Sequence, residues 1–519
     1  MGYIWFNKLI SHNTTCFMKQ LLQIVIAFLV FIFNAQAQVT SSWVKIDKDN
    51  KLSYYKDSVG NRIPDFTAVG YRGGTATFPT GRLVATLSPS GGDDTHRLQQ
   101  LIDSVSNLPT TDIPKVILLT KGNYTIASTI KINTNGLIIR GEGSNEDGTV
   151  ITYTATKQSD LLVVEGKGKL STAEGKSERI TDDYVPVGAY QFRVKHASSF
   201  TVNEPVVVRR IATDGWIHAI GMDNIQDLRD GGRNWEAKGF DQDFERIVTS
   251  VDKQTGTITI NAPIVMPMDA RYGGGLLMPY SFKGRISEVG IENLRMISTY
   301  SNETDEQHGW CAIKIEAAEN CWVQNVVSVH FGTSCVNIGS SSKNNTVRNC
   351  VCLDPVSIIT GGRRYSFNCD GQLNLFQNCT ARNGRHDFVT GGRVCGPNVF
   401  TYCTATLTHA DIGPHHRWAV GTLYDNVTSD GAINAQDRGN WGTGHGWSGA
   451  YQVFWNCISA EAAIQNPPMA YNWNIGYKGE NKGAKLVRNN GVWEAINVGG
   501  VTPASLYKAQ MAEVWMGKK

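Results

Sequence analysis

Residues 349–379 read NCVCLDPVSIITGGRRYSFNCDGQLNLFQNC, with an Asn-Cys pair at both ends. Related pairs recur along the C-terminal half of the chain at spacings of 23–31 residues. The series comprises Asn293, Asn320-Cys321, Asn349-Cys350, Asn378-Cys379, Tyr402-Cys403, Asp425-Asn426 and Asn456-Cys457. A position that recurs at such a period indicates a solenoid, in which each coil stacks on the next.

The repeating units contain short strands and turns but no helices. Upstream of the series, apolar strand patterns bounded by Gly, Asn or Lys-Gly turns follow one another at 116–119, 124–126, 129–132, 137–140 and 150–153. No long helical pattern follows before about residue 480. The chain is therefore predicted to be all-β, and the solenoid to be a single-stranded parallel β-helix. Inward ladders of Asn and Cys suit such a core, so stacked free thiols are favoured over disulfides, although export would permit disulfides.

Three segments depart from the repeat. In 93–105, apolar residues at 98, 101, 102 and 105 share one helical face and aspartates precede them, which predicts an N-terminal capping helix. Segment 205–285 breaks the rhythm and is predicted to be an insertion or a set of irregular coils. Segment 481–519 is predicted to be a C-terminal cap with a short helix. The catalytic β-helix domain then covers 38–480.

The first 37 residues are typical of a secretory signal. Lys19 precedes an apolar run at 21–33, and Ala35-Gln36-Ala37 forms a small-x-small cleavage site. The run is too short for a comfortable membrane span, and no later segment is apolar enough for one. We expect a secreted or periplasmic protein without a membrane span, cleaved near Ala37.

Composition narrows the class of partner. The chain has 519 residues, of which 41% are hydrophobic and 18% charged, which is a globular composition. The formal charge is +3, and removal of the two lysines in 1–37 leaves about +1 (3 − 2). A charge so close to zero gives no reason to expect nucleic-acid binding. We expect a monomer.

The stretches GGDDTHRLQQLIDSV (91–105), VILLTKGNYTI (116–126) and LIIRGEGS (137–144) resemble the opening of the pectate-lyase-like right-handed β-helix superfamily. There a capping helix precedes a strand, a Gly-x-Tyr turn and the first coils. GPHHRWAVGTLYDN (413–426) and DRGNWGTGHGWSGA (437–450) are similar to a segment of exported polysaccharide-degrading β-helix proteins. The resemblance implies a right-handed β-helix from about 66 to 480 that acts on a polysaccharide. Activity must still be argued from the site, because this fold carries several chemistries.

Arginines are concentrated in the same coils. Between 344 and 477 the chain has eight arginines and no lysine. Arg363, Arg364, Arg393, Arg417 and Arg438 recur close to the coil period and are predicted to form a column on one face. A guanidinium binds carboxylate or sulfate through two parallel bonds, which favours an anion-binding groove. The alternative is that these arginines pair with Asp370, Asp387, Asp411 or Asp437.

Histidines and aromatic residues complete the candidate site. Six of the ten histidines after residue 37 lie between 330 and 445, and histidine exchanges protons near neutral pH. Trp441 and Trp447 stand beside Gly and charged residues, as sugar-stacking residues do. Loop 438–449 is predicted to form a wall of the cleft. The predicted substrate-binding residues are Arg363, Arg364, Arg393, His409, Trp418, Trp441, His445 and Trp447.

A polyuronide could be cleaved here by β-elimination. The reaction needs a group that neutralises the uronate carboxylate, a base for the C5 proton and an acid for the leaving oxygen. We assign Arg417 and Arg438 to neutralisation, His416 or His386 to the base, and Tyr365 or His415 to the acid. The arginine density favours a sulfated polymer. The resemblance to exported polysaccharide-degrading β-helix proteins, taken with the arginine-rich groove, implies ulvan first, a glycosaminoglycan second, and alginate or pectin behind.

Two other functions stay open. A glycoside hydrolase would need paired carboxylates, for which Asp387, Asp411 and Asp437 are the candidates. A non-catalytic carbohydrate-binding protein would need neither paired carboxylates nor a base and an acid for elimination. We expect no metal site and no cofactor, because the predicted groove is basic. Asp370, Asp387 and Asp437 keep a calcium-dependent mechanism open.

Overall fold

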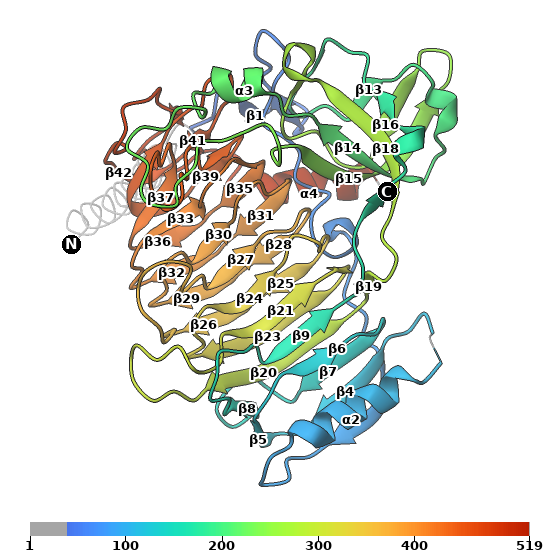
Figure 1. The fold of residues 1–519 in the computed structure, drawn as a ribbon, viewed down its shortest axis with the longest axis vertical. Coiled ribbons are helices and arrows are strands. Elements are labelled where there is room, and N and C mark those ends of the chain that lie inside the picture. Colours follow the sequence, from blue (N-terminus) through green and yellow to red (C-terminus); the bar gives the residue numbers. More distant parts are fainter. Residues whose placement is uncertain (1–38, 110, 518–519) are drawn as a thin grey trace, which may run out of the picture. The chain divides into compact units, whose positions relative to one another are not determined.

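The computed structural model describes residues 39–109 and 111–517, so the predicted signal segment 1–37 lies outside the described residues. Twenty-eight strands form one stacked, parallel assembly (Figure 1). This is the predicted right-handed parallel β-helix, in which each coil crosses over in the sense that parallel connections adopt. Each coil contributes strands to three faces, numbered here in the order in which the chain passes through them.

Face 1 is the longest column of strands. In stacking order it contains β3 (Arg82–Leu87), β4 (Lys115–Leu119), β7 (Leu137–Gly141), β20 (Gly290–Ser298), β23 (Trp322–Val329), β25 (Thr346–Arg348), β28 (Leu375–Gln377), β31 (Asn398–Thr401), β35 (Thr422–Asp425), β39 (Val453–Trp455), β41 (Trp473–Ile475) and β43 (Val492–Glu494).

Faces 2 and 3 follow in each coil. Face 2 contains β5 (Gly122–Ile126), β8 (Thr149–Tyr153), the second halves of β20 and β23, β26 (Val351–Leu353), β29 (Thr380–Arg382), β32 (Thr404–Thr406), β36 (Thr428–Ser429), the start of β40 (Ile458–Ile464), and β42 (Lys478–Asn481). Face 3 contains β6 (Ile130–Ile132), β9 (Leu162–Glu165), β21 (Cys311–Glu316), β24 (Ser334–Ile338), β27 (Phe367–Cys369), β30 (Phe388–Thr390), β33 (Asp411–Pro414), β37 (Ala432–Ala435) and the end of β40.

The bend between faces 1 and 2 is made by one left-handed residue per coil, with φ between 49° and 57°. These residues are Asn293, Asn325, Asn349, Asn378, Tyr402, Asn426 and Asn456. Asparagine tolerates this backbone better than most residues. Its side chain also bonds to the neighbouring coils: Asn349 Nδ2 donates to Asn325 Oδ1 at 3.2 Å, and Asn349 Oδ1 accepts from Asn378 Nδ2 at 3.2 Å. The recurring asparagine is therefore a structural ladder.

The prediction was wrong for one member of the series. Asn320-Cys321 does not align with Asn349-Cys350, because β23 and β25 pair Trp322 with Thr346 and thus place Asn325 beside Asn349. Asn320, with φ 51°, occupies a different bend, between faces 3 and 1, together with Asn344 at φ 52°. Both bends need a left-handed residue, so the same residue type marks two different corners.

The interior is built of ladders of like side chains. Phe376, Phe400, Tyr424 and Phe454 stack face to face, with ring centroids 4.6, 5.3 and 4.8 Å apart. The ten described cysteines are all free, and nine of them are buried, as expected for stacked thiols. The Cys379 thiol donates to the Val347 carbonyl of the neighbouring coil.

The N-terminal end of the helix is covered as predicted. Helix α2 (Thr95–Ser106) buries Leu98, Ile102 and Val105 against the first coils. The side chain of the N-cap residue, Asp94, accepts no bond from the helix backbone, but Asp93 Oδ1 accepts the Thr95 backbone N–H at 2.9 Å. The helix thus shields the apolar end of the first coil from water.

A second, antiparallel sheet lies beside the later coils (Figure 1). Its path is β10 (Ser171–Thr172), β18 (Gly275–Ser281), β14 (Pro205–Arg210), β15 (Gln242–Asp252), β16 (Thr257–Ile260) and β13 (Gln191–Arg193), with β11 (Glu178–Arg179) on β18. The sheet includes the predicted insertion 205–285 but begins earlier, at Ser171, since short strands before 205 pair with those inside it. β15 follows the turns of the solenoid: Gln242 Nε2 donates to the Trp418 carbonyl, and Glu245 N–H to Gln372.

The remaining elements are short. They are β1 (Val44–Ile46) with β2 (Leu52–Tyr54), β12 (Tyr184–Val185) with β17 (Met268–Asp269), β19 (Ile286–Ser287) with β22 (Ala318–Glu319), β34 (Ala419–Val420) with β38 (Gly449–Ala450), α3 (Asp214–Ala219), and the 3-10 turns η1 (Tyr71–Gly74), η2 (Glu174–Lys176), η3 (Ala197–Ser199) and η4 (Ala270–Tyr272). No helix within 39–109 and 111–517 is long and apolar enough to cross a membrane.

The C-terminal segment partly matches its prediction. β42 and β43 continue the solenoid past residue 480, and α4 (Leu506–Gly517) forms the expected helix. This helix packs along the side of the coils, because Asp425 accepts the backbone N–H groups of Leu506 and Tyr507. The segment therefore covers the asparagine bend of the later coils.

Replacing Asn349 should separate the two contributions of the ladder. Asn349→Ala loses two amide bonds and keeps a Cβ on a left-handed backbone, so we expect the free energy of unfolding to fall by about 2–4 kcal/mol. Asn349→Gly loses only the bonds, so its free energy of unfolding should fall by about 1–2 kcal/mol less than that of Asn349→Ala. Equilibrium urea unfolding measures both variants. Equal stability of the two variants would contradict the role of the left-handed bend.

Candidate active site

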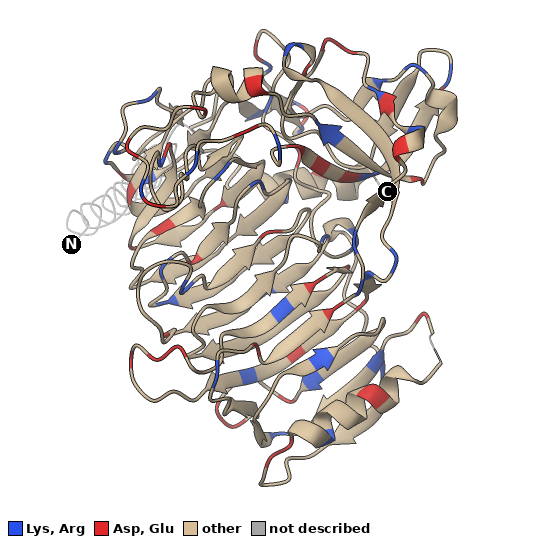
Figure 2. Ribbon diagram, viewed as in Figure 1, with Lys and Arg blue, Asp and Glu red and all other residues tan. Residues whose placement is uncertain are grey.

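A groove of about 650 Å³ lies where face 3 ends and the chain turns back to face 1. Its lining brings together five residues singled out in the sequence: Tyr365, Asp370, Arg393, His416 and Arg417. The inserted sheet forms one wall through Asp241 and Asp243. Charged residues gather in the loops and the inserted sheet and also occur on the strands of the first coils, such as β4, β7 and β20 (Figure 2).

The floor of the groove depends on two glycines. A Cβ on Gly391 would lie 2.2 Å from Asp370 Oδ1, and a Cβ on Gly392 would lie 3.1 Å from His416 Nε2. Both glycines follow β30, at the level where the neighbouring coil presents His415 and His416 after β33. Glycine at position 392 therefore leaves room for the His416 imidazole, whose Nε2 lies against the groove floor.

Behind the groove, Tyr365 belongs to a cluster with four histidines, called the histidine cluster here: Tyr365, His386, His415, His416 and His445. His415 lies at its centre, with ring centroids 4.5 Å from His386, 5.2 Å from His416 and 5.0 Å from His445. Tyr365 Oη and His415 Nε2 are 3.1 Å apart and share a hydrogen bond. A groove-lining hydroxyl is thus coupled to a buried imidazole.

The back of the cluster is an ion pair. Arg438 is 3% exposed and forms a close ion pair with Asp411, which is also buried. His386 Nδ1 is 2.7 Å from the Asp411 carbonyl oxygen and therefore donates its proton there. Burial opposes ionisation of Asp411, but the charge of Arg438 and its hydrogen bonds hold the pKa of Asp411 below the ordinary value. Arg438 and His386 thus lie behind the groove and do not line it.

The histidines are neutral at pH 7. Burial, aided by neighbouring cationic groups, lowers the pKa of His416 to about 3 and that of His445 to about 4. Burial lowers the pKa of His386 to about 4 even though Asp411 opposes the shift, and it also lowers the pKa of His415. Burial raises the pKa of Tyr365, so its hydroxyl keeps its proton. The groove therefore presents an unprotonated imidazole beside a protonated phenol.

Several buried atoms of the cluster have no hydrogen-bond partner: His386 Nε2, His415 Nδ1, His416 Nδ1, His445 Nδ1 and Arg438 Nε. Buried polar atoms are nearly always paired in folded proteins. Their concentration at one groove is a mark of a functional site, since a folding role alone would favour pairing.

Two arginines on adjacent coils flank the groove. The Arg393 backbone N–H donates to the Arg417 carbonyl at 2.8 Å, so their side chains leave neighbouring coils at the same level. Their guanidinium groups bond to neutral oxygens, of Gly239 and Thr443 respectively. Burial and the charge of Arg393 lower the pKa of Arg417. This pair of like charges is suited to an anionic group between them.

The predicted column of five arginines does not form, because the loops differ in length and sequence spacing does not translate into register. Arg363 forms an ion pair with Glu306 at 2.7 Å, and Arg364 is buried and donates to the Ser357 carbonyl. His409 is exposed and contacts Asn383. These three residues lie outside the groove lining.

The tryptophans do not line this groove either. Trp418 and Trp447 are each 2% exposed, and their indole N–H groups contact Met266 Sδ and the Ile220 carbonyl. Trp441 and Arg438 line a separate hollow of about 390 Å³. His445 contacts His416 at a centroid distance of 5.0 Å and thus borders the groove through it.

The groove also holds four carboxylates, of which sequence reasoning had named only Asp370. Asp370, Glu316, Asp241 and Asp243 line its other end, so the groove carries both signs of charge and is not uniformly basic. Burial raises the pKa of Asp370 and of Glu316. The insertion gave no hint of where Asp241 and Asp243 would lie, so no local signal could have placed them at this groove. Among residues 39–109 and 111–517, no three His, Cys, Asp or Glu side chains are grouped so as to hold a metal ion.

The hydrolase candidates are engaged elsewhere. Asp387 accepts from Ser366 at 2.6 Å and from Thr408, and burial raises its pKa to about 6. Asp437 forms an ion pair with Arg488 at 2.8 Å, and Asp411 holds Arg438. None of the three lines the groove.

No protein-family model and no curated protein matches the chain. Among solved structures it is similar to the tailspike protein of Pseudomonas phage LKA1, with a TM-score of 0.40 and 15% identity over 75% of this chain and 56% of that one. It is also similar to an alginate lyase from a Paenibacillus species, with a TM-score of 0.37 and 11% identity over 80% and 99% of the two chains. A pectate lyase gives a TM-score of 0.35 and 10% identity over 82% of each chain. At these scores, no statement about activity follows from the likeness.

Acid should destabilise the protein through His386. The unfolded chain protonates an ordinary histidine near pH 6.5, but folded His386 does so only at about 4, so the unfolded state binds the proton first as pH falls. Between pH 6.5 and 4 the wild type should therefore lose about 3 kcal/mol more unfolding free energy than His386→Gln.

Urea unfolding at stepped pH measures this difference, and His96→Gln, on the exposed face of α2, is the control. The unfolding free energy of the control should change with pH as that of the wild type does. A curve for His386→Gln that runs parallel to the wild type would overturn the assignment of a buried, neutral His386.

Proposed function

We propose that the protein is an exported polysaccharide lyase that cleaves a uronate-containing polymer by β-elimination in this groove. One observation carries the proposal. Arg393 and Arg417, which bond only to neutral oxygens, flank a groove that also presents the neutral imidazole of His416 and the protonated hydroxyl of Tyr365. These are the three kinds of group that the elimination requires.

The reaction begins with the uronate carboxylate between Arg393 and Arg417. Their charges stabilise the extra negative charge that develops on the carboxylate as the C5 proton leaves. His416 Nε2, which faces the floor at Gly392, takes that proton. The C5 electron pair forms the C4–C5 double bond and the bond from C4 to the glycosidic oxygen breaks.

Tyr365 supplies the proton for the leaving oxygen. Its phenol lines the groove and is hydrogen-bonded to His415 Nε2, 3.1 Å away. Proton donation leaves a phenolate, which the His415 imidazole and the cations behind it stabilise until a proton returns from solvent. The product then carries an unsaturated uronate at its new non-reducing end.

Arg438 and His386 have a supporting role in this proposal. The Arg438–Asp411 ion pair and the bond from His386 Nδ1 to the Asp411 carbonyl hold the back of the cluster in place. Of the residues assigned from the sequence, the proposal therefore keeps Arg417, His416 and Tyr365 as groups that touch substrate, and it adds Arg393 as the second neutralising group.

A hydrolase has less support. It needs two free carboxyl groups on either side of the scissile bond. Asp387, Asp411 and Asp437 are buried and bonded to hydroxyls or arginines outside the groove. Asp370 and Glu316 do line it, but they lie at the acidic end with raised pKa values.

Within the class of anionic polymers, we rank ulvan first, a glycosaminoglycan second, and alginate or pectin behind. The pair Arg393 and Arg417 accommodates one carboxylate or sulfate per sugar unit. The acidic end, with Asp370 and Glu316, favours a polymer whose charges are spaced and not continuous. Calcium dependence is part of the proposal to be tested, because these carboxylates border the same groove.

Incubation of the full chain with a panel of polyuronides, with and without a chelator, tests the proposal. Ultraviolet absorbance should rise on at least one polymer as the unsaturated uronate forms. New reducing ends without that absorbance would instead favour a hydrolase. Binding without any new ends would favour a carbohydrate-binding protein.

Removing one hydroxyl tests the acid. Tyr365→Phe keeps the ring but cannot donate a proton, so kcat on the cleaved polymer should fall by about 10²–10⁴-fold. Tyr424→Phe is the matched control, because Tyr424 is fully buried in the aromatic ladder and its hydroxyl is unpaired. The control should keep wild-type kcat. A Tyr365→Phe enzyme with wild-type kcat would remove Tyr365 from the reaction.

The pH profile tests the base. The pKa of His416 is lowered to about 3 and that of Tyr365 is raised, so kcat/KM should stay level from about pH 5 to above neutrality. An ordinary histidine base would instead lose activity below its pKa of about 6.5. Initial rates, with a return to pH 7 to check recovery, separate this effect from acid unfolding. A fall in kcat/KM as the pH drops through about 6.5 would contradict His416 as the base.

A further inference from the structure

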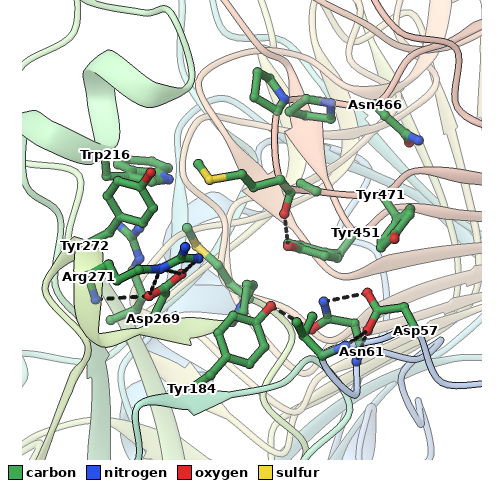
Figure 3. Close-up of a pocket in the computed structure, with 18 of the residues that line it drawn as sticks. Asp57, Asn61, Tyr184, Trp216, Asp269, Arg271, Tyr272, Tyr451, Asn466 and Tyr471 are labelled. Carbon is green, nitrogen blue, oxygen red and sulfur yellow. Dashed lines mark hydrogen bonds and ion pairs between the residues drawn. The ribbon is translucent and has the colours of Figure 1, made fainter.

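A second pocket, of about 360 Å³, lies between the inserted segment and the last coils (Figure 3). It is lined by the N-terminal stretch around Asp57 and Asn61, by the inserted segment, and by residues of the later coils, which include Trp418, Tyr451 and the loop 466–471. It shares no lining residue with the groove. Its volume lies within the range of about 300–1,000 Å³ that is usual for small-ligand sites.

The walls of this pocket are rich in aromatic rings: Tyr184, Trp216, Tyr272, Trp418, Tyr451 and Tyr471. Figure 3 shows several of them around the same space. Tyr184 Oη donates to Asn61 at 3.0 Å and Tyr451 Oη to the Met469 carbonyl at 3.0 Å, so their hydroxyl groups are held by the protein. Aromatic walls around a pocket of this size suit a sugar ring.

The pocket is also lined by a buried cation, Arg210, for which the described residues supply no ion pair. Arg210, on β14, is 3% exposed, and its Nη1 is buried without a hydrogen-bond partner. Its guanidinium carbon lies 4.0 Å from the centre of the Trp216 ring. A buried guanidinium is costly unless hydrogen bonds or an opposite charge compensate it. An anionic ligand in the pocket would supply both.

The acids around the pocket do not fill this role. Asp269 is paired with Arg271 at 2.6 Å. Asp57 accepts the Val59 and Asn61 backbone N–H groups and the Asn61 amide. Burial lowers the pKa of Arg210 to about 10, although the charges of Asp241 and Asp269 oppose the shift, so the guanidinium stays protonated at pH 7. Among the described residues, no carboxylate forms an ion pair with Arg210, and its Nη1 keeps an unused hydrogen-bond donor.

We propose that this pocket is a second, non-catalytic binding site for an anionic sugar unit. The sugar ring packs against the aromatic walls and its carboxylate accepts from the Arg210 guanidinium. Arg417 lines the groove and the adjacent Trp418 lines the pocket, so the stretch after β33 separates the two sites. A site so placed would hold one part of a polymer while another part occupies the groove.

Titration with sodium D-glucuronate tests this proposal, with D-glucose as the neutral probe. Calorimetry gives the affinity, and the emission of Trp216 and Trp418 reports on the pocket. The wild type should bind glucuronate more tightly than glucose. Arg210→Gln should weaken glucuronate binding at least tenfold, whereas Arg417→Met should leave the tryptophan response to glucuronate unchanged.

A second variant guards against misfolding of Arg210→Gln. Val59 lines the pocket and is 53% exposed, so Val59→Trp fills the space without touching the buried charge. It should also weaken binding at least tenfold. Unchanged glucuronate affinity in Val59→Trp, or loss of the tryptophan response in Arg417→Met, would overturn the proposal. The test uses a monosaccharide that cannot be cleaved, so its outcome is independent of whether the groove is a lyase site.

Discussion

The whole structure depends on one backbone constraint: each coil must turn sharply at the same corner with a left-handed residue. Asparagine satisfies it in coil after coil, and its amide bonds to the equivalent amide above and below. Because each bend aligns with the next, the strands of all three faces stay in register. The interior ladders, such as the one from Phe376 to Phe454, follow from that alignment.

The stacked strands are regular, but the loops between them differ in length and sequence. The candidate site lies among these loops. Tyr365 lies just before face 3, and His415 and His416 lie just after it two coils later, yet the three side chains come within reach of one another. The inserted sheet closes one wall of the groove through Asp241 and Asp243. Burial holds the histidines neutral beside Arg417, which is what makes an acid–base reaction on an anionic sugar chemically reasonable at neutral pH.

Sequence reasoning was most reliable where the repeat is strict. The β-helix and α2 were predicted from the spacing of the asparagines and from the apolar residues of 93–105. It failed at Asn320, because two corners of the coil demand the same left-handed residue, and at the arginine column, because loops of unequal length break the link between spacing and register. Trp418 and Trp447 were placed at the groove from their neighbours in the sequence, but both indoles are buried against the insertion.

The sequence by itself determined the architecture and the chemical types at the site, since period, left-handed asparagines and the cluster of His and Arg are all local properties. Only the tertiary structure decided which of these residues meet. His416 and Arg393 share a groove with Asp243 of the insertion, and Arg438 turns away to Asp411. The physical reason is that register and loop packing, which involve residues far apart in the chain, set both the distances and the burial that tunes each pKa.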